Sequence, residues 1–208
     1  MAKEKIKIIC SDGRELSALK YSASGKTKGA VLVGGATGLR KEFYSPFCQH
    51  LCENNYSVLV FDFRGVGKSS LQDLKSDTAN IIDWGVLDMS AALDELVKQF
   101  PKTKYHLVGH SAGGQLTGLM SNHSQLTSQF NFACSTGQLS NLKFLFRLKA
   151  LFFMKIFIPL SNLIFGYAKL GLVKMGDSIP RYVAKQWCDW CCGNGYVIGS
   201  IGLSLIHI

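Results

Sequence analysis

The sequence predicts an α/β fold with a mostly parallel sheet and helices on both faces. Apolar, strand-like runs alternate with helical patterns over residues 1–137, and short apolar runs end in Gly-rich turns. At 208 residues the chain has the length of one domain, or of one domain with an insertion. With 47% hydrophobic and 18% charged residues, it can bury a sizeable core, which excludes a disordered chain.

Six strands are expected in order. The first two flank the turn at Asp12-Gly13 and form a hairpin, and the other four are separated by helical patterns. Because helical crossovers join these later strands, they are expected to run parallel. The predicted strands are Ile6–Cys10, Glu15–Tyr21, Ala30–Val33, Ser57–Phe63, Tyr105–Val108 and Phe130–Cys134.

Three helices are expected between these strands. Residues Glu42–Asn54 have apolar positions at helical spacing and end at an Asn pair. Residues Asp83–Phe100 form an amphipathic pattern that stops before Pro101, and Gly113–His123 is the third helix. These helices complete a core domain over residues 1–137.

The pattern changes at Gln138. Residues Leu142–Val173 are rich in Phe, Leu and Ile with regularly placed cations, which predicts two or three helices lying over the sheet. We therefore expect a helical lid over residues 138–192 and an incomplete tail over residues 193–208. The longest apolar run, Ile156–Ala168, is interrupted at Pro159, so the sequence does not predict a membrane span.

The net charge of +9 is concentrated in this helical region. The window Asn141–Lys185 holds eight cations and the single anion Asp177, or +7. In one interpretation the cations extend to water while Phe and Leu cover the active-site pocket. In the other, the region contacts an anionic membrane surface. Nucleic acid is not an expected partner, because the cations alternate with large apolar residues.

The cysteines and glycines exclude several other classes of protein. Seven Cys is an odd number, and the N-terminus lacks an apolar signal segment, which predicts reduced thiols and a cytoplasmic protein. Cys188, Cys191 and Cys192 lack a further ligand pair, so no metal is expected. Asp62 stands where a P-loop ending at Gly67-Lys68-Ser69 would need Gly, so no nucleotide cofactor is expected. No cofactor of any other kind is expected either.

One motif carries chemistry. Gly109-His110-Ser111-Ala112-Gly113 is a G-x-S-x-G that follows the strand Tyr105–Val108 and opens a helix. This is the setting of a nucleophile elbow, with Ser111 as the nucleophile and the Ala112 N–H as an oxyanion donor. A second donor should come from the loop Gly34–Gly38, where Ala36 is the best candidate and Thr37 the next.

Three segments resemble the α/β-hydrolase superfamily: Val31–Gly38, Gly109–Gly114 and Phe61–Ser69, which matches its D-x-R-G-x-G-x-S turn. Phe43-Tyr44 and the pair Trp187 and Trp190 are similar to predicted hydrolases of the serine aminopeptidase-like (S33-type) group. The likeness covers roughly residues 5–197. It implies an eight-stranded core with a lid after the sixth strand. The sequence departs from the superfamily at Gly34, where His is frequent.

The triad acid and base are missing from this pattern. In this fold the order is Ser, then Asp or Glu, then His, and only His207 is a His in the right order, next to the end. We therefore expect a truncated chain, whose last residues LSLIHI resemble translated adapter DNA.

The predicted function is a serine hydrolase that cleaves an ester, thioester or amide of a small, apolar acyl substrate. This chain is expected to be inactive or very weak without its base. The alternative is a non-catalytic hydrolase-fold binding protein or a lipid-surface protein.

Overall fold

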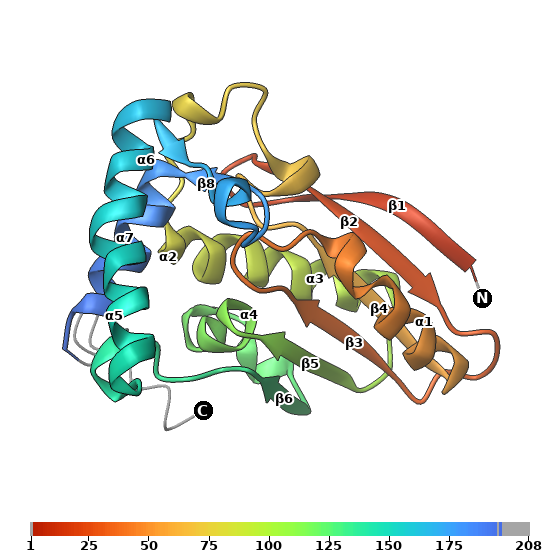
Figure 1. Ribbon diagram of the computed structural model, residues 1–208. Coiled ribbons are helices and arrows are strands. Elements are labelled where there is room, and N and C mark those ends of the chain that lie inside the picture. The colour runs from red at the N-terminus through yellow and green to blue at the C-terminus, as the bar shows by residue number, and fades with distance from the viewer. Residues whose placement is uncertain (1, 195, 197–208) are drawn as a thin grey trace.

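The computed structural model describes residues 2–194 and 196. Its main sheet has six strands in the order β1-β2-β4-β3-β5-β6 (Figure 1). Strands β1 and β2 form the expected hairpin, β2 pairs antiparallel with β4, and the other three pairings are parallel. The strands are β1 (Ala2–Ile9), β2 (Glu15–Ser22), β3 (Gly29–Gly34), β4 (Tyr56–Phe61), β5 (Tyr105–His110) and β6 (Ser128–Phe132).

Alternation along the central strands builds one core on each face of the sheet. Val31 and Val33 of β3 pack toward helix α1 (Ser45–Glu53), whereas Ala30 and Leu32 pack toward the opposite face. All of β3 is buried, as expected for a central parallel strand. The predicted α/β class with helices on both faces is therefore confirmed.

The opposite face carries a helical stretch from Ile81 to Gln99. It consists of α2 (Ile81–Asp83), π-helical turns over Trp84–Met89 and α3 (Ser90–Gln99). Asn80 caps its start by accepting hydrogen bonds from the N–H groups of Ile82 and Asp83. The prediction of a helix here was right to within two residues.

Two predicted segments need correction. The helix expected over Gly113–His123 is much shorter, because α4 spans Ala112–Gln115 and only a 3-10 turn follows over Thr117–Leu119. Consecutive glycines have low helix propensity, so nothing local extends this helix. The sixth strand lies two residues earlier than predicted, and its exposed edge lets it begin at the polar residues Ser128 and Gln129.

Residues 142–173 contain one long helix, where two or three helices were expected. Helix α5 (Phe144–Phe152), π-helical turns at Phe153–Phe157 and α6 (Ile158–Phe165) follow without a break. Pro159 did not end the helix, because it lies in the first turn of α6, where the register has already changed. We call Phe144–Phe165 the outer helix, since it stands at one edge of the molecule (Figure 1).

The chain then returns along the outer helix. Strands β7 (Tyr167–Ala168) and β8 (Ile179–Pro180) form a small antiparallel pair that the sequence did not predict. Helix α7 (Arg181–Cys192) follows and lies beside the outer helix (Figure 1). In the described part of the chain, the outer helix is the one segment that is long and apolar enough to cross a membrane, by length and composition.

Candidate active site

Ser111 lies at a sharp turn between β5 and α4. Its backbone angles are φ +50° and ψ −112°, a conformation that non-glycine residues rarely adopt. Such strain persists only where the surrounding structure enforces it, and it is concentrated at functional sites. The Ser111 N–H donates to the Phe132 carbonyl at 3.2 Å, which fixes the turn against β6. The predicted position of Ser111 after a strand and before a helix is therefore what the structure shows.

Glycines let the turn pack closely on its neighbours. A Cβ on Gly113 would lie 2.2 Å from the Gly34 carbonyl carbon, and one on Gly109 would lie 2.4 Å from the Gly114 Cα. Real Cβ atoms do not approach backbone this closely, so both positions require Gly. The Gly113 N–H also donates to the Gly35 carbonyl at 3.0 Å. The loop after β3 is thereby held against the start of α4.

The two predicted oxyanion donors differ in whether their N–H groups are already hydrogen-bonded. The Ala112 N–H opens α4 and makes no hydrogen bond to any residue in the described ranges. The Ala36 N–H, by contrast, donates to the Tyr44 hydroxyl at 2.8 Å, and Ala36 is nearly buried. An oxyanion would have to displace Tyr44 to use this donor. Only one of the two donors is therefore free in this conformation.

Tyr44 also contacts the residue before Ser111. Its hydroxyl lies 2.9 Å from His110 Nδ1. The Tyr44 oxygen accepts from Ala36, and in the tautomer that carries its proton on Nε2, His110 accepts from the Tyr44 hydroxyl at Nδ1. Burial lowers the pKa of His110 and raises that of Tyr44 to about 12, so both are neutral at pH 7.

His110 points away from Ser111. Its ring stacks on Phe132 with centroids 4.5 Å apart, on the side of the turn that Tyr44 occupies. His110 is therefore not a base for Ser111 in this arrangement.

A buried ion pair positions Tyr44. Asp62, directly after β4, accepts hydrogen bonds from the Lys41 N–H at 2.7 Å and from Lys41 Nζ at 2.6 Å. Both side chains are almost fully buried. Lys41 begins the 3-10 turn that ends at Tyr44, so this pair fixes the turn. Sequence analysis missed the pair, because its partners are 21 positions apart and no local pattern indicates their contact.

Asp62 also holds the turn that follows β4. Its carboxylate accepts from the Lys68 N–H at 3.0 Å, and its carbonyl accepts from the Ser69 hydroxyl at 2.8 Å. Asp62 therefore has a structural role in this turn. The sequence had no signal for Lys41, and Tyr44 was quoted only as part of a family likeness.

A cavity of about 400 Å³ opens beside Ser111. Gln115 and Ser135 supply polar groups on the side of the sheet, and the Gln115 amide donates to the Ser135 carbonyl at 2.7 Å. The outer helix and α7 supply a mostly apolar wall through Phe146, Ala150, Phe153, Met154 and Trp187. The helical region thus covers Ser111 with its apolar side chains. Ala36 is absent from the described lining of this cavity.

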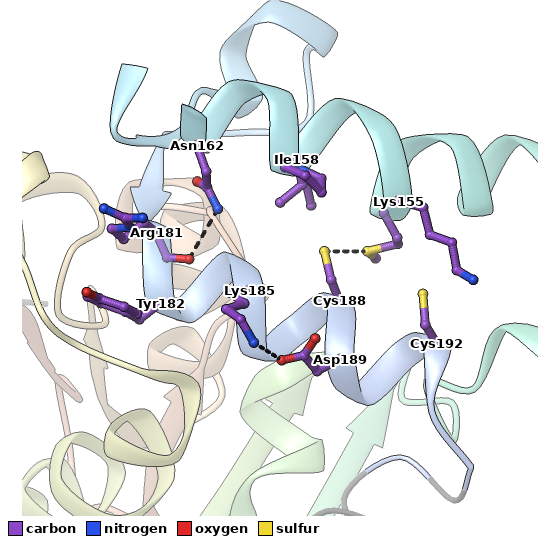
Figure 2. Close-up of a pocket in the computed structure, with 11 residues that line it drawn as sticks. Lys155, Ile158, Asn162, Arg181, Tyr182, Lys185, Cys188, Asp189 and Cys192 are labelled. Carbon is purple, nitrogen blue, oxygen red and sulfur yellow. Dashed lines mark hydrogen bonds and ion pairs between the residues drawn. The ribbon is translucent and has the colours of Figure 1, made fainter. Parts of the chain in front are cut away.

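A second pocket, of about 530 Å³, lies between the outer helix and α7 (Figure 2). Met154 lines both pockets and separates them, and the Cys188 thiol contacts its sulfur at 3.6 Å. Lys155 and Arg181 border this second pocket, whereas Lys185 is paired with Asp189 at 2.7 Å. It is the larger of the two, but none of the residues that line it has a positive φ like that of Ser111.

The part of the chain that the structure describes offers no base for Ser111. The Ser111 hydroxyl makes no hydrogen bond to residues 2–194 or 196, and no imidazole or carboxylate of these residues contacts it. Asp189 is bound to Lys185, and Asp177 to Arg40. His207 and most of the predicted tail lie outside the described residues. Within the same limits, no cluster of metal-ligating residues is present.

Comparisons with known proteins agree with this architecture. The chain is 30% identical over 102 residues to RutD of Variovorax paradoxus, a provisional carbamate hydrolase, and this match covers 49% of the chain and 35% of the relative. A hypothetical protein from Pseudomonas aeruginosa aligns with a TM-score of 0.63 at 16% identity, covering 94% of this chain and 73% of that one. A carboxyl esterase from Bacillus coagulans aligns with a TM-score of 0.54 at 20% identity, covering 78% and 55%.

These structural likenesses establish the fold. The chain spans about a third of the length of the RutD relative and about half of that of the esterase. The family model described as serine aminopeptidase, S33, matches residues 25–161, which include the Tyr44 turn, Asp62 and Ser111. The chain therefore belongs to the serine aminopeptidase S33 family of α/β hydrolases.

Proposed function

We propose that the protein is a serine hydrolase in which Ser111 attacks the carbonyl carbon of an acyl substrate. The observation that carries this proposal is the strained Ser111 turn, which opens into an apolar cavity of about 400 Å³. The Ala112 N–H is unpaired among the described residues and adjoins the nucleophile, as an oxyanion donor must. The family and the hydrolase fold support the same reaction class.

In this mechanism the Ser111 oxygen bonds to the acyl carbon as its proton passes to a base. The carbonyl oxygen becomes an oxyanion that the Ala112 N–H stabilises, and the leaving group departs with a proton to give an acyl-enzyme. Water then releases the acid. Phe146, Phe153 and Trp187 favour an apolar acyl group in the cavity, whether its bond is an ester, thioester or amide.

The base and its acid partner belong, in this proposal, to residues outside the described ranges. A free Ser hydroxyl is almost wholly protonated at neutral pH, so Ser111 alone is a weak nucleophile. We therefore expect the 208-residue chain to react slowly with fluorophosphonate probes. A longer homologue that supplies a His and a carboxylate should label rapidly.

Imidazole rescue tests the proposal on this chain directly. Added imidazole should accelerate fluorophosphonate labelling by acting as an external base, and intact-mass and peptide analysis should place the label on Ser111. Ser111→Ala should abolish the accelerated reaction. Ser135→Ala, a serine that lines the same cavity, is the matched control and should label as the wild type does. Labelling that persists in Ser111→Ala would contradict the role of Ser111.

The second candidate function is a non-catalytic binding protein that uses the same cavity. Two observations favour it: the Ser111 hydroxyl has no partner among the described residues, and Tyr44 occupies the Ala36 N–H. A binding protein should take up an apolar acid into the cavity and quench Trp187, yet show no Ser111 labelling with imidazole or in a longer homologue. Rapid Ser111 labelling in that homologue would exclude this alternative.

A further inference from the structure

We propose that the outer helix docks on the surface of an anionic phospholipid bilayer and lies in its plane. Nine large apolar side chains are exposed along the helix, each with between 48% and 82% of its surface open to solvent. Six of them recur every three or four residues and so form one continuous stripe. We call them the outer stripe: Leu145, Leu148, Phe152, Ile156, Leu160 and Leu163.

The outer stripe is separate from the side of the helix that packs on the protein. Met154, Ile158 and Ser161 are buried, and Phe146 and Ala150 help line the Ser111 cavity. The helix is therefore apolar toward the core and apolar toward solvent. The interpretation in which the cations extend to water while Phe and Leu cover the pocket therefore does not account for the outer stripe.

The charges around the stripe select its partner. Lys143, Arg147, Lys149 and Lys155 are exposed on or beside the helix. No Asp or Glu occurs between Glu95 and Asp177, so no anion offsets these cations along this stretch of chain. Cations beside an exposed apolar helix match a surface that presents phosphate headgroups above hydrocarbon.

A second copy of the chain fits this surface less well. Two outer helices packed stripe to stripe would bring eight cations together without a carboxylate, and such like-charge contacts are unfavourable. The lipid surface supplies both the apolar phase and the opposite charge. The charge pattern therefore favours the bilayer.

The packing of the outer helix decides whether it lies in the membrane interface or spans the bilayer. Its 22 residues could span a bilayer by length, at about 1.5 Å per residue. Spanning, however, would expose Met154 and Ile158 and leave the Ser161 hydroxyl without its Tyr167 carbonyl acceptor. Lying in the interface keeps these contacts and buries only the outer stripe. The Ser111 cavity then lies about one helix diameter, some 10 Å, from the lipid.

Vesicle flotation tests the proposal with the 208-residue chain. Binding should be strong to phosphatidylcholine vesicles with 30% phosphatidylglycerol, weak to pure phosphatidylcholine, and much reduced at 1 M salt, where the Debye length falls to about 3 Å. Each cation at the surface contributes about fivefold in partitioning, so Lys149→Gln with Lys155→Gln should weaken binding about 30-fold. Lys5→Gln with Lys26→Gln, which changes exposed lysines elsewhere, should leave it within about twofold.

The apolar stripe is tested separately. Leu148→Gln with Leu160→Gln should also abolish flotation, whereas Ile9→Gln, at an exposed apolar position on β1, should not. The Trp fluorescence of a Leu163→Trp variant should be quenched strongly by lipids brominated near the headgroup end of the acyl chain. Lipids brominated near the terminal methyl group should quench it little.

Three results would overturn the proposal. They are equal binding to neutral and anionic vesicles at every salt concentration, flotation that survives the stripe changes, and deep quenching typical of a spanning helix. Stripe-dependent dimers in solution, without vesicle binding, would instead assign this face to a second copy and would equally refute the bilayer.

Discussion

The Tyr44 hydroxyl connects the loop after β3 to the Ser111 turn. It accepts from the Ala36 N–H and lies 2.9 Å from His110 Nδ1, and the Lys41–Asp62 pair holds the turn on which it lies. Tyr44 thus occupies the Ala36 N–H, which is the second oxyanion donor that the sequence predicts.

Removing the Tyr44 hydroxyl tests whether the Ala36 N–H can serve as an oxyanion donor. In Tyr44→Phe the Ala36 N–H is released, so a longer, active homologue carrying the same change should gain turnover if Ala36 is an oxyanion donor. One such donor is worth on the order of 10²–10³ in kcat. Ester turnover measures this outcome, and an unchanged or reduced kcat would show that Ala36 has a structural role only.

The same variant has a second readout that does not depend on catalysis. Burial lowers the pKa of His110, and in the tautomer in which Tyr44 donates to Nδ1 the hydrogen bond also favours the neutral ring, so its loss should raise the pKa of His110. NMR titration of the His110 ring measures this shift. Tyr21→Phe, which removes a hydroxyl bound to Ser45, is the control and should leave the His110 pKa unchanged.

The Lys41–Asp62 pair should be costly to break. Lys41→Met leaves Asp62 charged and buried without its partner, which typically costs about 3–5 kcal/mol in the free energy of unfolding. Lys7→Met removes the partner of Glu15 from an exposed pair and should cost less than about 1 kcal/mol. Urea denaturation compares the two variants. Equal losses would show that Asp62 is screened by solvent and that the pair does not anchor the turn.

Helix α4 and strand β3 meet without side chains between them. Gly113 donates to Gly35 and lies against Gly34, so the short helix rests directly on the strand end. Close approach of these two elements sets the height of the Ser111 turn above the sheet. The elements are therefore positioned by backbone contact, which no apolar pattern records.

Gly113→Ala should push these elements apart. Its Cβ would lie 2.2 Å from backbone that cannot move independently, so overpacking should cost at least the usual 1–3 kcal/mol or so and disturb the Ser111 turn. Gly171→Ala is the matched control, because its Cβ would lie 3.8 Å from the nearest atom and should change stability little. Thermal unfolding and imidazole-assisted labelling of Ser111 report the two effects. Normal stability of Gly113→Ala would refute the contact.

Arg64 joins three distant parts of the molecule. Its Nε donates to Asp88 at 2.6 Å on the helical stretch Ile81–Gln99, and its Nη1 donates to Asp12 at 2.7 Å in the β1–β2 turn. Arg64 itself follows β4, and its carbonyl accepts from Trp84 Nε1 at 3.0 Å. One guanidinium thus ties the hairpin, the central sheet and the helical face together.

This network should make the free energy of unfolding depend on pH through Asp88. Burial raises the pKa of Asp88 to about 6, although Arg64 opposes the shift. The unfolded value is near 3.9, so between pH 6 and 4 the folded protein binds a proton that the unfolded chain does not. Asp88 therefore adds stability as the pH falls from 7 to about 4.

The Asp88→Asn variant isolates this contribution. The free energy of unfolding of the wild type minus that of Asp88→Asn should increase from pH 7 to pH 5 in chemical denaturation. A difference that stays constant over that range and falls only below about pH 5 would mean that the Arg64 ion pair keeps the pKa of Asp88 below its unfolded value.

Local patterns in the chain were enough to predict the α/β class, six strands and the turn that carries Ser111. Strand alternation, Gly-rich turns and the G-x-S-x-G motif act over a few residues, so each is visible without knowing its neighbours in space. Their errors are also local: α4, which contains two consecutive glycines, is shorter than predicted, and Pro159 lies within the outer helix where the helical register changes.

The contacts that determine which groups at the site are hydrogen-bonded could be identified only from the tertiary structure. Tyr44 meets Ala36 and His110 across 8 and 66 residues, and Lys41 meets Asp62 across 21, separations at which the chain carries no periodic signal. The outer stripe could not be assigned for a related reason. The apolar pattern shows that Leu145 and Met154 can both be buried, but only packing against α7 and the sheet leaves Met154 inside and Leu145 facing solvent.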